Sequence, residues 1–302
     1  MALRLDRHTA YSDPGPWADL LTAVEPDPAV LSAVARNVIV HYRDDAVATP
    51  PHTRDDIHAR WLVRSLERDQ QRHGSAALDV ARAPEERVQG CCRDHTLFAC
   101  AVLRQHGIAA RGRLGFAGYL NPGFHHDHVV VEARLDGPDG RWVRFDPELS
   151  GPQGGLDTPM DMPTGPDSPF PTAAEVWRSW RAGQIDPQQY GVAPGHPEGG
   201  PTMIQQYVLR DLAHRFGEEL LLWDAWGAMA PPGRDVPEDL VTLTDRVAAQ
   251  VVAADAGNSV AEEALRCWFL SDPRLHPGDR VHRFDPDGGP PVEESLARAD
   301  HS

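Results

Sequence analysis

Residues 90–95 read Gly-Cys-Cys-Arg-Asp-His and open the stretch that decides the fold, which extends to Pro147. After Cys92, apolar residues recur at spacings of three and four as far as Gly107, a pattern that predicts a helix closed by a left-handed glycine. A thiol at the start of a helix lies near unpaired backbone N–H groups and the positive end of the helix dipole, which favour the thiolate. Cys92 is therefore the candidate nucleophile.

A predicted hairpin follows this helix. Residues 128–135 form a strand-like run that begins at His128, and residues 141–146 form a second run that ends at Asp146. An antiparallel hairpin brings His128 and Asp146 to the same end of the pair. There, His128 can accept the thiol proton, and Asp146 can orient the imidazole and stabilise its cation. We therefore predict Cys92, His128 and Asp146 as nucleophile, base and orienting carboxylate.

Four short motifs in this stretch resemble the transglutaminase-like superfamily, whose members share a papain-like core. The motifs are Gly-Cys-Cys-Arg-Asp at 90–94, Gly-Ile-Ala-Ala-Arg at 107–111, His-Val-Val-Val-Glu at 128–132 and Asp-Pro at 146–147. The resemblance selects Cys92, the residue before Arg-Asp, over Cys91 as nucleophile. Residues 210–212 and 222–227 are also similar to the helical C-terminal part of stand-alone bacterial members.

This chain departs from the family's wording at two positions. Ala109 stands where proline is usual, which makes the loop less stiff, and Val130 stands where tryptophan is usual. We expect the second departure to change the lining of the substrate pocket. Neither affects the three predicted catalytic residues.

The expected fold is α+β, with a small antiparallel sheet packed on the nucleophile helix and extra helices at the N- and C-terminal ends. The resemblance makes this a papain-like, transglutaminase-like core. We expect one such domain over residues 1–275, with N-terminal helices in 1–85, the catalytic core in 86–150 and a loop and helical part in 151–275. A polar, Pro-rich composition predicts a flexible tail over 276–302.

Periodicity and capping signals predict helices on both sides of the core. Ten of the 28 prolines fall within 151–201, so most of that segment is predicted to be irregular, and its first part, 151–171, is a candidate lid or substrate wall. The expected helices cover 28–42, 53–74, 172–180, 202–229, 237–256 and 260–271, with capping boxes at Thr172–Glu175 and Ser259–Glu262.

Composition limits the classes of partner. Hydrophobic residues make up 41% and charged residues 25%, which is typical of a soluble globular protein. The net charge of −16 argues against nucleic acid as a partner, and short apolar runs argue against a membrane. Four cysteines, two of them adjacent, suggest no disulfide framework, and no secretory signal follows Met1. We therefore expect a cytoplasmic protein.

All 29 basic residues are arginine, and the chain contains no lysine. A protein cross-linker that used lysine amines could therefore not join copies of itself through internal lysines.

The run His-His-Asp-His at 125–128 raises the question of a metal site, since imidazole and carboxylate groups are good ligands. In a strand, His126 and His128 share one face, whereas His125 and Asp127 point to the other. No second ligand cluster has a plausible spacing, so we predict no metal and no cofactor.

Acyl transfer also requires hydrogen-bond donors for a developing oxyanion. The backbone N–H of Cys92 is the natural first donor, and the Gln89 side chain is the candidate second donor. Glu132 shares a strand face with His128 and is either a supporting partner of the imidazole or a satisfied sheet residue. Asp94, in the first helical turn, is expected to be a surface carboxylate that complements the helix dipole.

These residues predict a cysteine enzyme that acts on an amide or thioester carbonyl through a covalent thioester on Cys92. An amine acceptor would give transamidation or amide formation, and water would give hydrolysis by a cysteine peptidase or amidase. A second alternative is a non-catalytic relative that binds peptides in the former active-site groove. The expected partners are a peptide, protein or small-molecule amide or thioester and, for transamidation, an amine. The sequence specifies neither the acyl donor nor the oligomeric state.

Overall fold

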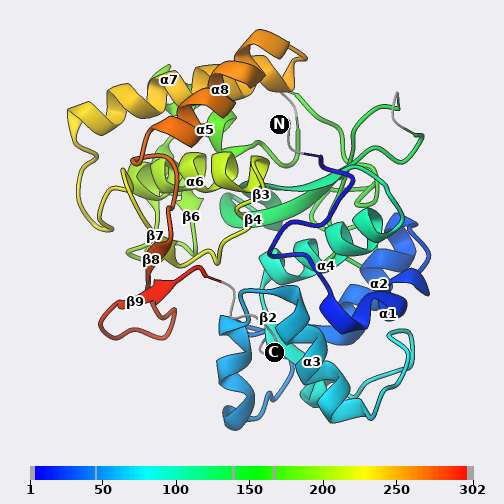
Figure 1. Ribbon diagram of the computed structural model, residues 1–302. Coiled ribbons are helices and arrows are strands. Elements are labelled where there is room, and N and C mark those ends of the chain that lie inside the picture. Colours follow the sequence, from blue (N-terminus) through cyan, green and yellow to red (C-terminus); the bar gives the residue numbers. More distant parts are fainter. Residues whose placement is uncertain (1–3, 45, 138–139, 166–167, 298–302) are drawn as a thin grey trace. The chain divides into compact units, whose positions relative to one another are not determined.

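The computed structural model describes residues 4–44, 46–137, 140–165 and 168–297. Figure 1 labels the helices and strands where there is room. The chain forms two compact units, which are described separately. The first unit contains residues 1–113 and 129–163, and the second contains 114–128 and 164–302.

The first unit holds the N-terminal helices and the nucleophile helix. Its helix α2 starts where the Asp27 carboxylate accepts hydrogen bonds from the backbone N–H groups of Ala29 and Val30, with Pro28 in the first turn. The main elements are α1 (Ala18–Thr22), α2 (Pro28–Val38), α3 (Leu62–His73), α4 (Cys92–Gln105) and the parallel pair β1 (Ile39–His41) and β2 (Val88–Gly90).

Two helix boundaries predicted in this unit are wrong. The helix expected over 28–42 ends at Val38, because the next residues pair with β2. The helix expected from Thr53 begins at Leu62, after a 3-10 segment at Pro51–His58. The Thr53 hydroxyl donates to the Pro50 carbonyl and accepts from Gln89, so it caps no α-helix.

Helix α4 follows the prediction. The backbone N–H of Cys91 donates to the Asp94 carboxylate over 2.9 Å, which completes a capping box, and Gly107 closes the helix with a φ of +71°. Asp94 is buried rather than at the surface, because it serves as this cap and also pairs with Arg93 over 2.8 Å. The Thr96 hydroxyl donates to the Val129 carbonyl over 3.0 Å, which fixes α4 beside strand β4 (Phe124–Ala133).

The predicted hairpin is present. In β4, Val131, Glu132 and Ala133 pair antiparallel with Phe145, Arg144 and Val143 of β5 (Val143–Phe145). Strand β3 (Ala110–Asn121) lies on the other side of β4, and β6 (Tyr190–Gly191) pairs parallel to the first part of β4. Two residues of the turn expected between the hairpin strands, 138–139, lie outside the described residues.

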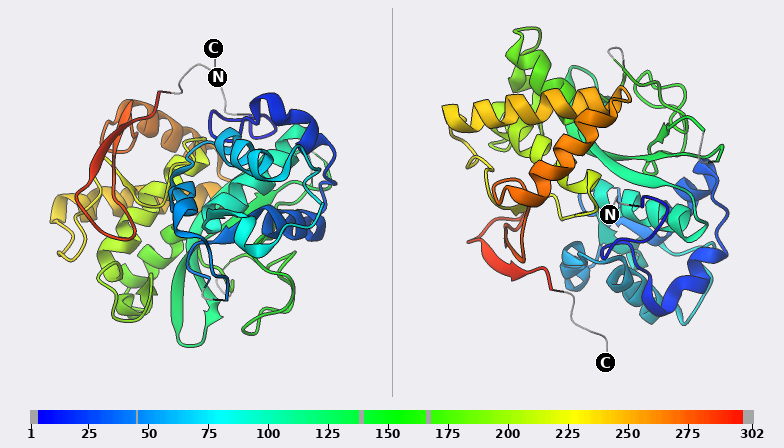
Figure 2. Two further views of the ribbon diagram at one scale, coloured as in Figure 1. Left: turned by 90° about the horizontal axis from the view of Figure 1, so that it is seen from below. Right: turned by 45° about the horizontal axis from the view of Figure 1, so that its top comes forward.

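The second unit contains the C-terminal helices. The capping box predicted at Thr172 and Glu175 starts α5, whereas α8 is capped by Asn258 and not by the box predicted one residue later. The helix expected over 202–229 ends at Arg215, and Gly217 follows with a φ of +88°. Helices α7 and α8 lie side by side in Figures 1 and 2. The four helices are α5 (Ala173–Arg181), α6 (Gly200–Arg215), α7 (Glu238–Asp255) and α8 (Ser259–Ser271).

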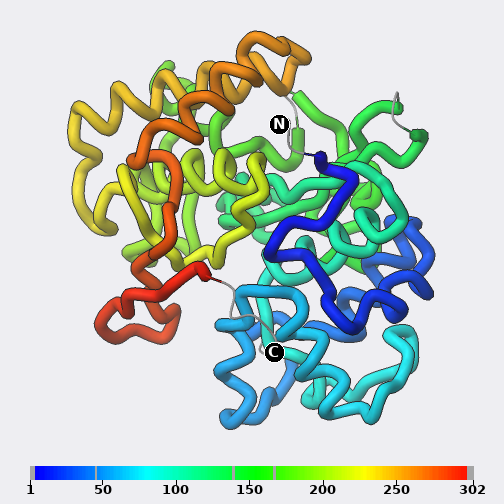
Figure 3. The backbone as a smooth tube through the Cα atoms, in the orientation of Figure 1, coloured from blue at the N-terminus to red at the C-terminus, as the bar shows by residue number. Residues whose placement is uncertain are grey.

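The segment predicted to be a flexible tail contains regular structure. Strands β8 (Arg280–Arg283) and β9 (Val292–Ser295) form a hairpin, and β8 also pairs with β7 (Asp224–Ala225). Figure 3 shows the red backbone of this hairpin folding back on itself. Val281 is buried, whereas most of the hairpin is exposed.

The α+β class is confirmed: in the order of the sequence, helices precede and follow the strands of a small sheet. The extent of a single domain over 1–275 stays a prediction. Within the described ranges, each helix is too short or too polar to cross a bilayer.

Candidate active site

Cys92 is the first residue of α4, as predicted. It is buried, with 5% of its surface exposed, and its Cys91 neighbour occupies the capping position in an extended conformation. The start of a helix provides backbone N–H groups that favour a thiolate and can also receive an oxyanion. The local backbone therefore suits Cys92 to nucleophilic attack.

The neighbouring thiol of Cys91 has a different environment. A hydrogen bond with Cys92 lowers the pKa of Cys91, but burial and the Asp94 carboxylate raise it by more, so that this pKa lies above its ordinary value. Cys91 is therefore held as a protonated thiol at neutral pH, which agrees with the choice of Cys92.

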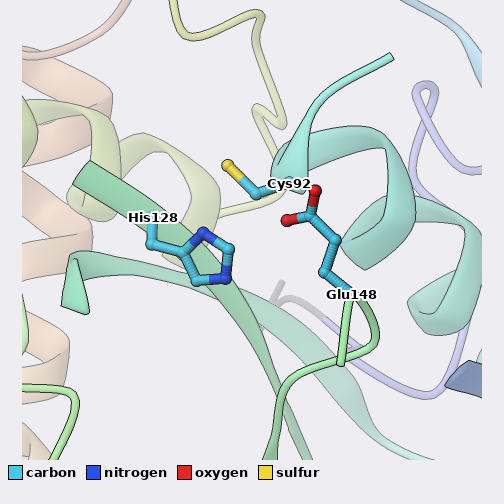
Figure 4. A group of neighbouring side chains, drawn as sticks. All are labelled: Cys92, His128 and Glu148. Atoms are coloured by element: carbon cyan, nitrogen blue, oxygen red, sulfur yellow. The ribbon is translucent and has the colours of Figure 1, made fainter. Parts of the chain in front are cut away.

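His128 and Glu148 meet Cys92 in one group of side chains (Figure 4). One ligand atom of each residue, the Cys92 sulfur, a ring nitrogen of His128 and a carboxylate oxygen of Glu148, lies within 4.8 Å of the others. Cys92 comes from the start of α4, His128 from β4 and Glu148 from the loop that follows β5. The structure thus joins two predicted residues to a third that the sequence analysis did not select.

Aromatic rings flank the imidazole of His128. The ring of Tyr119 packs edge-on against it at a centroid distance of 6.3 Å, and that of Phe170 at 6.4 Å. His128 is only 3% exposed. Such surroundings limit the access of bulk water to the imidazole and strengthen its electrostatic interactions.

Glu148 is the most accessible member of the group, with 18% of its side chain exposed. Its Oε1 lies 3.9 Å from Nδ1 of His95, one helical turn beyond Cys92, and that nitrogen is 3.0 Å from the Cys91 carbonyl oxygen. The carboxylate therefore faces the first turn of α4 and not the solvent alone.

Asp146, predicted as the orienting carboxylate, is fully buried at the end of β5. Its Oδ1 accepts a hydrogen bond from the backbone N–H of Glu148 over 2.9 Å, and its own N–H donates to the Pro159 carbonyl over 3.0 Å. Asp146 thus fixes the turn that carries Glu148. Its role as a partner of His128 stays a prediction.

Gln89, the candidate second oxyanion donor, uses its amide nitrogen elsewhere. Nε2 donates to the Thr53 hydroxyl over 2.7 Å and to the Pro50 carbonyl over 3.3 Å. Gln89 is buried, so its amide N–H groups hold the loop before α3. An oxyanion role would require these bonds to break, and it stays a prediction.

Glu132 is a member of a buried ion cluster. Its Oε2 accepts from Arg111 Nε over 3.0 Å and from Arg113 Nη1 over 2.9 Å, and its Oε1 accepts from Arg144 Nη2 over 2.6 Å. Burial raises the pKa of Glu132, but the three guanidinium charges lower it by more, so this pKa lies well below its ordinary range. These partners account for the buried carboxylate without a role at His128.

The other residues of the His-rich run have separate partners. The His125 ring stacks on Tyr190 at a centroid distance of 4.4 Å, and His126 Nδ1 is 2.8 Å from the Val192 carbonyl oxygen. The Asp127 carboxylate accepts a hydrogen bond from the Tyr207 hydroxyl. Among the described residues, His128 alone of this run belongs to a group with metal-ligand spacing.

Val130 and the loop over 151–171 were expected to shape the substrate pocket. Val130 is fully buried, so it acts through packing. The loop is tied to β5 where the backbone N–H of Met162 donates to the Arg144 carbonyl over 2.7 Å, and residues 166–167 of the loop lie outside the described part. Its role as a lid stays a prediction.

The family comparison agrees with this site. Residues 42–147, about a third of the 302 residues, match the transglutaminase-like superfamily. A solved structure titled "Putative Cysteine Protease from Cytophaga hutchinsonii" is 18% identical, with a TM-score of 0.30, and the match covers 48% of this chain and 40% of that chain. No curated protein matches.

The resemblance predicted from four motifs is therefore confirmed over residues 42–147, which are a transglutaminase-like segment. This segment contains Cys92, His128 and Asp146. The match supports a cysteine-based catalytic role. It does not extend to residues 210–227, where Asp211 accepts from the backbone N–H of Leu114 and Arg210 donates to the Asp224 carbonyl.

Proposed function

We propose that this protein is a cysteine-dependent acyltransferase that acts on an amide or thioester carbonyl. The observation that carries the proposal is the buried Cys92 thiol at the start of α4, with a ring nitrogen of His128 within 4.8 Å of its sulfur. A nucleophile and a base in this arrangement perform acyl transfer in two steps.

In the first step, Cys92 gives its proton to His128, and its sulfur forms a bond to the substrate carbonyl carbon. The tetrahedral intermediate collapses, the bond to the leaving amine or thiol breaks, and His128 returns the proton to that group. The product is a thioester on Cys92. In the second step, His128 takes a proton from the acceptor, which attacks the thioester carbonyl carbon. The bond from that carbon to the Cys92 sulfur breaks, and His128 returns the proton to the sulfur.

An amine acceptor gives transamidation or amide formation, and this is the reaction that we favour. The aromatic rings of Tyr119 and Phe170 beside His128 support this choice, because they disfavour bulk water at the thioester. Hydrolysis as a cysteine peptidase or amidase is the alternative, since a single water molecule can use the same base. A non-catalytic peptide-binding relative is the second alternative.

The proposed substrates are a peptide, a protein or a small-molecule amide or thioester, and no cofactor takes part. We also propose a cytoplasmic location, which the four free cysteines support, because a reducing compartment keeps such thiols usable.

Trapping of the acyl-enzyme tests the proposal. The protein is incubated with glutamine-containing peptides, with and without a fluorescent primary amine. The reaction is then quenched in acid, and the mass of the protein is measured by mass spectrometry. We expect a thioester adduct on Cys92 and transfer of the acyl group to the amine. A carboxylate product alone would indicate hydrolysis. The absence of an adduct, with slow alkylation of Cys92 by iodoacetamide at mildly acidic pH, would support the peptide-binding alternative.

A further inference from the structure

The group formed by Cys92, His128 and Glu148 has the composition of a zinc site. It offers one thiolate, one imidazole and one carboxylate, which are the three ligand types that zinc accepts in proteins. Calcium and magnesium prefer sets made of oxygen atoms alone, so a sulfur ligand selects against them. We infer that this group binds one Zn²⁺ ion, with a water molecule as the fourth ligand.

The spacing of the group agrees with this inference. Zinc lies about 2.3 Å from sulfur and about 2.0 Å from nitrogen, so that tetrahedral ligand atoms are roughly 3.5 Å apart. The three ligand atoms here lie within 4.8 Å of one another, and small side-chain rotations close that difference.

Burial and support also suit a metal. Cys92 and His128 are almost fully buried, which protects their bonds to a cation from water, whereas the Glu148 side chain is partly exposed. The backbone bond from Glu148 to Asp146 fixes the position of the third ligand. Ligands whose positions are fixed by hydrogen bonds to neighbouring groups bind a metal more tightly than ligands without such support.

Binding of zinc changes the protonation of the group. The metal takes the Cys92 thiolate, the neutral His128 imidazole and the Glu148 carboxylate, so a proton held on any of these ligand atoms is released to solvent when zinc binds. This consequence is independent of any substrate.

The effect on catalysis depends on the proposed function. Zinc occupies both the nucleophile and the base, so the loaded protein cannot form the thioester. We infer that zinc is a reversible inhibitor of this site, with Glu148 as the residue that converts a catalytic pair into a metal site.

A competition titration tests the inference. The titration uses the reduced 302-residue chain with the substitution Cys267→Ser, which removes an exposed thiol. ZnCl₂ is added to a mixture of this protein and a chromophoric chelator, and the absorbance of the chelator reports how the zinc divides between them. We expect one zinc per chain. Glu148→Gln should weaken binding by at least about tenfold. Asp157→Asn, which removes an exposed carboxylate in the loop over 151–171, should leave the zinc affinity unchanged.

Two further variants separate this inference from the proposed function. Cys92→Ala should abolish zinc binding, and Cys91→Ser should retain it. Zinc should also slow the alkylation of Cys92 by iodoacetamide, and a chelator should restore the rate. Equal zinc affinity in Glu148→Gln and Asp157→Asn, or binding that survives Cys92→Ala, would overturn the inference. Failure to trap an acyl-enzyme would count against the proposed function alone, since the titration uses no substrate.

Discussion

Glu148 lies opposite His128 when the register of the β4–β5 hairpin is continued beyond its last pair. Three residues outward from Val131 and Phe145 along the two strands lead to His128 and Glu148. The chain turns at Asp146, but the Glu148 carboxylate still lies close to the His128 imidazole and the Cys92 sulfur. One residue, Pro147, separates Asp146 from Glu148, and the backbone N–H of Glu148 donates back to the Asp146 carboxylate in this turn. The end of the hairpin therefore brings the Glu148 carboxylate to the imidazole, whereas the pairing of Asp146 with His128 stays a prediction.

The two adjacent cysteines should differ in function. Cys92→Ala should abolish turnover, whereas Cys91→Ala should retain most of it, because neighbouring helical residues point about 100° apart. The raised pKa of Cys91 also favours Cys92 over Cys91 as the nucleophile. Steady-state rates and the mass of an iodoacetamide adduct check this. An inactive Cys91→Ala beside an active Cys92→Ala would mean that the assigned nucleophile is off by one residue.

Asp146→Asn should fold normally and lose activity by a factor of roughly 10⁴ while still forming some acyl-enzyme. The asparagine carbonyl oxygen can still accept the backbone bond from Glu148, so the turn is kept. The charge that stabilises the imidazolium is lost. Thermal unfolding and single-turnover rates together provide the measurement. A variant that unfolds at ordinary temperature would show that Asp146 has a structural role only.

Glu132→Gln should destabilise the protein by about 3–5 kcal/mol without a direct effect at Cys92, because it leaves three buried guanidinium groups without their common carboxylate. Urea unfolding at neutral pH measures this loss. Glu86→Gln, at an exposed position, is the matched control and should change stability by less than about 0.5 kcal/mol.

The same carboxylate should make the protein sensitive to acid. The pKa of Glu132 is lowered in the folded state, so its contribution to stability is complete above the unfolded pKa of about 4.3 and is lost as the pH falls through the folded pKa. The free energy of unfolding of the wild type should therefore fall below about pH 4.3. The difference in that free energy between wild type and Glu132→Gln should shrink over the same range, and a constant difference would contradict the assignment.

Chelators should not lower the activity of the purified protein. If zinc is present in the preparation, EDTA should raise the activity, since the metal occupies Cys92 and His128. The measurement is the initial rate before and after dialysis against EDTA, with metal analysis of both samples. A loss of activity that zinc restores would replace the cysteine mechanism by one with a metal-bound water.

The absence of lysine leads to a prediction about self-modification. If lysine amines are the acceptors, the enzyme should couple other chains but should not form covalent polymers of itself, because only its α-amino group can react. Pure protein incubated at high concentration with reductant should stay monomeric on a denaturing gel. Covalent ladders under these conditions would mean that the acceptor is a different nucleophile.

The sequence predicted the nucleophile helix and the hairpin because their signals are local. Apolar spacing after Cys92 and the strand-like runs around the turn are properties of short segments. Glu148 could not be selected in this way, since its position opposite His128 depends on the register. Register follows from the conformation of the turn, which composition does not define.

The hairpin of β8 and β9 was missed for another physical reason. Its strands lack an apolar face, and Val281 is the member whose side chain is buried. Ion pairs across the strands, such as Arg283 with Glu294 over 3.1 Å, accompany the backbone pairing instead. Charged residues in a Pro- and Gly-rich segment are also typical of irregular chain, so the pattern predicted a tail.

The cluster around Glu132 has a consequence for how the catalytic segment folds. Its four charged groups come from three strands, with Arg111 and Arg113 on β3, Glu132 on β4 and Arg144 on β5. An intermediate that buries the arginines before the carboxylate arrives is costly, and so is the reverse order. The three strands should therefore gain protection from hydrogen exchange together, in one cooperative step of folding.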